Sequence, residues 1–126
     1  MLAVAEQSEL NSQIVPKIAT GFCGGVSRTK GICGAVSGAV MALGMMLGRT
    51  KPEDSSEQIY EKVQQLISVF ELHHGSSNCF ELTGCDFRNP SDRLKWRDTG
   101  IRDKCLKFSQ WCACSVADLI ADKTPR

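Results

Sequence analysis

A chain of 126 residues is long enough to form one domain that buries about two-thirds of the surface of its unfolded form, so it does not need disulfide bonds to fold. Fifteen Lys and Arg against 14 Asp and Glu give a net charge of +1, so no electrostatic attraction favours nucleic acid or a membrane surface as a partner. The seven cysteines are expected to be thiols, metal ligands or a redox pair in a cytoplasmic protein, since the first residues do not resemble a signal peptide.

The N-terminal segment AVAEQSELNSQIVPKIA predicts the end of one helix and then a second short helix. A glycine-rich loop follows, GFCGGVSRTKGIC, which holds Cys23 and Cys33 ten residues apart. The two glycines after Cys23 permit a tight turn that would carry this cysteine back towards Cys33. Arg28 and Lys30 would then add positive charge beside the two sulfurs.

The 18 residues between Lys30 and Arg49 carry no charge. Their number is at the lower edge of the about 20 apolar residues that span a bilayer, but five glycines, a serine and a cysteine make the run only weakly hydrophobic. Gly34 and Gly38 lie at helical spacing, which allows another backbone to approach closely. We therefore predict a buried central helix in a water-soluble bundle, and the same small residues make homodimer packing an alternative.

The segment SSEQIYEKVQQLISVFELHHG gives the clearest helix prediction. Its start is predicted at residues 52–55, because proline and acidic residues before a serine are typical of a helix N-terminus. Its end is predicted at His74–Gly75, where histidine favours the terminal carbonyls and glycine the left-handed cap. The apolar residues of this helix share one stripe: Ile59, Val63, Leu66, Ile67 and Phe70.

Two further segments follow this helix. GSSNCFELTGCDF predicts a short helix that opens at Ser77 or Asn78 and closes at Gly84. RNPSDRLKWRDTG is predicted to be a polar connection, marked by Pro90 and Gly100.

The last helix is predicted over residues 102–121. Its buried face is indicated by Cys105, Phe108, Cys112, Val116 and Leu119. Cys114 turns away from that face. Because no segment shows the alternation of a strand, the predicted fold is all-α, a compact bundle of four to five helices around the Gly/Ala-rich central helix.

Three cysteines from distant parts of the chain fall near predicted helix N-termini: Cys33, Cys79 and Cys105. Unpaired backbone N–H groups and the positive end of the helix dipole stabilise a thiolate, so we expect the pKa of these thiols to be lowered from about 8.5. A lone cysteine is more often a small buried side chain, and Cys112 and Cys114 are interpreted in that way. Three cysteines at helix starts instead indicate a binding or redox site.

Two other residues are second-choice ligands for such a site. His74 ends a helix ahead of Cys79 and is a candidate for a mixed Cys/His site, although capping of the helix end is its favoured role. Cys85 adjoins a glycine turn. No pair of cysteines has the C-x₂-C spacing of zinc-ribbon, thioredoxin-like or ferredoxin sites, and no hydrolase or transferase signature is found.

Residues 19–49, residues 70–86 and the DKCLKF stretch around Cys105 together resemble the redox-active protein family named for its C_GCAxxG_C_C cysteine pattern. The CGAxxG core of this resemblance is present as CGAVSG at residues 33–38. The resemblance extends over roughly residues 2–120. It implies a helical domain, related to part of split-Soret cytochromes, with a clustered cysteine site that binds a redox centre, most simply an iron–sulfur cluster.

The resemblance implies that Cys33, Cys79 and Cys105 are ligands of this centre. The family pattern begins with one more cysteine, and the segment expected to carry it is missing, so either the native chain starts upstream or Cys23 takes its place. We therefore predict one helical cysteine-cluster domain over residues 1–126 with these four cysteines as metal ligands. Cys23 and Cys33 are also the candidate redox thiols.

Three functions remain open from the sequence. The first is electron transfer or redox sensing by an iron–sulfur protein, a component of an oxidoreductase whose partner protein the sequence does not identify. The second is a thiol–disulfide redox protein in which two low-pKa thiols form a reversible disulfide. The third is a non-catalytic helical protein that forms homodimers and holds structural zinc or no metal.

Overall fold

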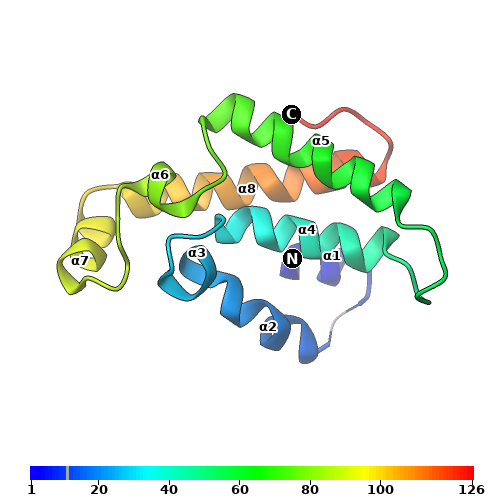
Figure 1. Ribbon diagram of the computed structural model, residues 1–126, viewed down its shortest axis with the longest axis horizontal. Helices are drawn as coiled ribbons and strands as arrows, with labels where there is room; N and C mark the ends of the chain where they lie inside the picture. The colour runs from blue at the N-terminus through cyan, green and yellow to red at the C-terminus, as the bar shows by residue number, and fades with distance from the viewer. Residues whose placement is uncertain (11) are drawn as a thin grey trace.

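The computed structural model describes residues 1–10 and 12–126, and Figure 1 shows that they fold into an all-α bundle, which confirms the predicted fold class. Three long helices form its centre: α4 (Gly34–Leu47), α5 (Glu57–His74) and α8 (Ile101–Ile120). The shorter elements are α1 (Leu2–Gln7), α2 (Ile14–Ala19), the 3₁₀ turn η1 (Thr20–Phe22), α3 (Cys23–Arg28), α6 (Cys79–Thr83) and α7 (Pro90–Asp98). The described residues form no β-strand and only one isolated bridge, between Ile32 and Asn78.

The hydrophobic core lies where α4, α5 and α8 meet. Six of its larger side chains have no exposed surface: Val36, Leu43, Leu66, Phe70, Val116 and Leu119. Full burial of such a side chain stabilises the fold by about 1.5–3 kcal/mol. Cys112 belongs to this core, as predicted, whereas Cys114 is only partly buried.

Helix α4 is the central helix of the bundle, as its composition predicts. Its neighbour α5 packs against it at Gly44, where an added Cβ would make ordinary van der Waals contact with Cδ1 of Ile59 at 3.7 Å. Ala39 and Ala42 are buried on the same helix. Within residues 1–10 and 12–126, no helix is long and apolar enough to cross a membrane.

Helix α5 begins later than the predicted start at residues 52–55. The acidic residue there caps a turn rather than the helix, because an Asp54 carboxylate oxygen accepts hydrogen bonds from the Thr50 and Lys51 N–H groups at 3.1 and 3.0 Å. The helix ends where predicted, and Gly75 takes the left-handed conformation with φ 87°.

Helix α7 corrects the prediction of a polar connection after Phe87. Pro90 occupies its first turn, Asp92 lies near its N-terminus, and Lys95 and Arg97 lie in its last turn, all of which suit the helix dipole. None of its residues is buried. The apolar periodicity that reveals the other helices is therefore absent from α7.

Candidate cysteine site

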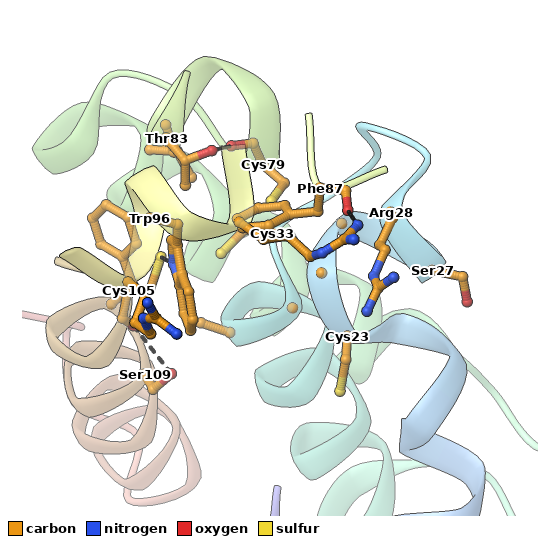
Figure 2. Close-up of a pocket in the computed structure, with 18 of the residues that line it drawn as sticks. Cys23, Ser27, Arg28, Cys33, Cys79, Thr83, Phe87, Trp96, Cys105 and Ser109 are labelled. Carbon is orange, nitrogen blue, oxygen red and sulfur yellow. Dashed lines mark hydrogen bonds between the residues drawn. The ribbon is translucent and has the colours of Figure 1, made fainter. Parts of the chain in front are cut away.

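A cavity of about 1270 Å³ lies where α3, α6 and α7 meet the first halves of α4 and α8. Cys23, Cys33, Cys79 and Cys105 all line this cavity, and Figure 2 shows them around it. These cysteines come from four separate segments of the chain. The structure thus brings the predicted ligand set to one cavity.

Cys33 and Cys79 are positioned by a short antiparallel contact between residues 31–33 and 77–79. Ile32 and Asn78 form its bridge. The Cys33 N–H donates to a carbonyl of the opposite segment at 2.7 Å, and the Cys79 N–H does so at 2.8 Å. Because side chains alternate along extended backbone, both cysteines face the same side of this pair.

Asn78 fixes the start of α6 and so the position of Cys79. Its side-chain oxygen accepts a hydrogen bond from the Glu81 N–H at 3.0 Å, which is a helix N-cap. Its side-chain N–H donates to the Lys30 carbonyl at 2.7 Å. One side chain therefore ties α6 to the loop that precedes α4, and the predicted start of this helix is confirmed.

The segment α3 is not a regular right-handed helix, because its residues 24–28 form a loop that winds in the left-handed sense. Gly25 has φ 72°, and the next two residues, Val26 and Ser27, have φ 56° and 53°. This conformation costs about 1–2 kcal/mol for each residue other than glycine. A Cβ at Gly25 would lie only 2.5 Å from Cβ of Cys79, so glycine allows the loop to pass directly over that cysteine.

Cys23, the first residue of α3, lines the cavity. Its backbone returns to the start of α4, as predicted, because a Cβ at Gly34 would lie 3.6 Å from the Cys23 Cα. The Cys23 thiol itself is exposed and lies 3.9 Å from the Ala19 carbonyl. In Figure 2 its sulfur is directed away from Cys33 and Cys79.

Cys105 lies early in α8 and is partly buried. The indole N–H of Trp96, on α7, donates to its sulfur at 3.4 Å. The sequence gives no sign that Trp96 belongs to this site, because a contact between two different helices leaves no spacing signal. Trp96 is thus a site residue that sequence reasoning missed.

The thiol pKa values differ from the prediction at two of the helix starts. Burial raises the pKa of Cys33, although hydrogen bonds from the Ala35 and Val36 N–H groups at the start of α4 lower it. Burial, followed by the nearby Cys33 and Cys105 sulfurs, raises the pKa of Cys79 to about 11. The expected lowering is therefore wrong for Cys33 and Cys79, because desolvation outweighs the helix N-terminus.

Three other charged or ligating candidates do not line the cavity. Cys85 is buried beside it, with 1% of its surface exposed. The His74 ring packs on the Phe70 ring with centroids 4.6 Å apart. Lys30 lies 3.4 Å from an Asp86 carboxylate oxygen instead of beside the thiols.

The donor set of the cavity consists of cysteine thiols, which are soft ligands for transition metals. In residues 1–10 and 12–126, no three Cys, His, Asp or Glu side chains are grouped so that they could hold a metal ion. Four thiols around one cavity, with N–H donors to Cys33 and Cys105, are compatible with a metal cofactor.

Comparison with known proteins gives one family match. The family described as "Putative redox-active protein (C_GCAxxG_C_C)" matches residues 1–121 of the 126. No curated protein and no solved structure matches the chain. The matched range contains all seven cysteines.

Proposed function

The chain belongs to the C_GCAxxG_C_C family of redox-active proteins, and on that premise we propose that its cavity holds an iron–sulfur centre for electron transfer or redox sensing. Its ligands are Cys33, Cys79 and Cys105, with Cys23 as the fourth. The observation that carries the proposal is that these four thiols, from separate segments, line one cavity. When bound, the centre accepts and returns one electron.

The chain's own N–H groups supply the electrostatic environment of the sulfurs. Trp96 donates to the Cys105 sulfur at 3.4 Å. The Ala35 and Val36 N–H groups act on the Cys33 sulfur. Donors of this kind offset the negative charge of thiolate ligands and raise the reduction potential of a centre relative to a site without them.

The raised thiol pKa values favour a metal centre over thiol–disulfide exchange. Exchange needs a thiolate at neutral pH, and burial raises the pKa of Cys33 and brings that of Cys79 to about 11. A coordinating metal displaces the thiol proton outright. The free thiols of Cys33 and Cys79 are therefore poor nucleophiles but adequate metal ligands.

Cys23 is the weakest of the four ligands. Its thiol is exposed, and in Figure 2 its sulfur is directed away from Cys33 and Cys79. The side chain must therefore rotate to reach a shared centre. We expect replacement of Cys23 to lower the retention of the centre rather than to abolish its assembly.

Anaerobic reconstitution with ferrous iron and sulfide tests the proposal. The wild type is expected to turn brown, with broad visible absorbance and matching iron and sulfide contents. Cys79→Ser and Cys105→Ser are expected to lose both. Cys114→Ser is the matched control, because Cys114 lies on α8 outside the cavity lining. A colourless wild type, or equal iron in all variants, would overturn the proposal.

A further inference from the structure

The cavity extends beyond its cysteines and has a basic wall. Three arginines line it, Arg28, Arg93 and Arg97, and among the described residues no aspartate or glutamate does so. Its volume of about 1270 Å³ is above the roughly 300–1000 Å³ that is usual for a small-molecule site. A cleft whose lining carries charge of one sign attracts ligands of the opposite sign.

The charges of these arginines are incompletely neutralised. Arg93 donates at 2.6 Å to the backbone carbonyl of Phe87, which is a neutral acceptor. Arg97 pairs with Asp98 at 2.8 Å, but both side chains are more than half exposed, at 61% and 57%, so the pairing is weak. Arg28 has no carboxylate partner within the described residues, and Figure 2 shows it across the cavity from Trp96 and Cys105.

The same part of the cavity offers apolar surface. Phe87, Leu94 and Trp96 line it, and 52% of Leu94 is exposed. The cavity lining thus includes large hydrophobic side chains that no neighbouring element covers completely. An organic anion would use both the charge and the apolar surface, whereas an inorganic anion would use only the charge.

We propose that the cavity binds a small organic anion between α3 and α7. Its charged group pairs with Arg28 and Arg93, and its apolar body packs against Phe87, Leu94 and Trp96. This binding requires no iron–sulfur centre, so it goes beyond the function proposed above. A ligand held there lies in the same cavity as the Cys105 sulfur, where it has access to a redox centre.

Two probes with the same ring system test the charge requirement on iron-free protein. 8-Anilino-1-naphthalenesulfonate carries a sulfonate, and N-phenyl-1-naphthylamine lacks it. Arg28→Gln is expected to weaken binding of the sulfonate about fivefold, which corresponds to about 1 kcal/mol, and to leave the neutral probe unchanged. Arg93→Gln is expected to weaken binding of the sulfonate in the same way. Added salt should weaken binding of the sulfonate probe but not of the neutral probe.

Two controls establish where the probe binds. Arg102→Gln, on α8 outside the cavity lining, should change neither probe. The chain has two tryptophans, so Trp111→Phe leaves Trp96 as the only one, and energy transfer from it to the bound sulfonate is expected. Absence of sulfonate binding, or binding that neither arginine variant weakens, would overturn the proposal. An equal loss of binding of both probes in an arginine variant would also overturn it. Because no iron is present, these results leave the iron–sulfur proposal unaffected.

Discussion

The two ends of the molecule are stabilised by different interactions. At one end α4, α5 and α8 bury large apolar side chains completely, among them Leu43, Leu66 and Phe70. At the cavity end α3, α6 and α7 are short, and α7 buries no residue. Besides the buried Leu82 and Phe108, that end is held by one backbone bridge, the Asn78 side chain and the close approach at Gly25. We infer that the apolar end contributes most of the free energy of folding. The cavity end contributes less, because its short elements surround a cavity instead of a packed core.

Truncation of an apolar side chain at each end gives the largest contrast. Leu66→Ala, in the core, is expected to lower the free energy of unfolding by about 3–4 kcal/mol, because it removes a fully buried side chain and leaves a cavity. Leu94→Ala, at the cavity end, should cost less than about 0.5 kcal/mol, since this side chain is 52% exposed. Urea unfolding measures both free energies. Equal losses of stability in the two variants would contradict the inference that the apolar end contributes most of the stability.

Gly25→Ala tests the strained loop at the cavity end. It is expected to cost about 2–3 kcal/mol, because the new Cβ adds backbone strain at φ 72° and meets Cys79 Cβ at 2.5 Å. Gly75→Ala is the matched control, since that glycine has φ 87° and no atom within 4 Å of the new Cβ. The control should cost only the strain, about 1–2 kcal/mol. Equal losses of stability in the two variants would contradict a close contact between residue 25 and Cys79.

Asn78 offers a smaller test of how the cavity end is held. Asn78→Ala is expected to cost about 1 kcal/mol, because the N-cap of α6 and the bond to the Lys30 carbonyl are both lost. Asn78→Asp keeps the capping oxygen and loses only the bond to Lys30, so it should recover part of that stability. Thermal unfolding compares the two, and identical melting temperatures would show that the cap does not matter.

The smallest expected effect is a pH dependence at the apolar end. Burial, followed by the charges of His73 and Lys104, lowers the pKa of His74 below 6.5. Because the unfolded chain binds this proton more readily, stability should fall as pH falls through about 6.5 towards the lower folded-state value. His74→Phe removes the titration and also a buried Nε2 without a hydrogen-bond partner. Its stability should therefore depend less on acid pH than that of the wild type, and equal slopes in urea unfolding would contradict this.

Elements of the core are predictable from the sequence because burial imposes a period on it. The stripe of α5 predicts that Leu66 and Phe70 face the core, and both are completely buried. Helix α6 is predictable from local signals, Asn78 before it and Gly84 after it. Helix α7 is not, because none of its residues is fully buried and it leaves no apolar period.

The cavity is less predictable because it depends on contacts between distant segments. The glycine pair after Cys23 predicts a turn, but Val26 and Ser27 give no sign that they adopt left-handed backbone. The helix start at Cys33 correctly predicts N–H groups near its sulfur. The sequence predicts the wrong direction for the pKa shift of Cys33, because desolvation depends on the packing around the thiol, which the sequence does not show.

Alkylation of the individual cysteines before and after anaerobic reconstitution tests the central claim most directly. Iodoacetamide labelling followed by peptide mass spectrometry measures the rate at each thiol. We predict that reconstitution slows labelling of Cys23, Cys33, Cys79 and Cys105 together, while the rate at Cys114 stays the same. Unchanged rates at the four cavity cysteines in iron-loaded protein, or slowing at Cys114 instead, would contradict their role as ligands of one centre.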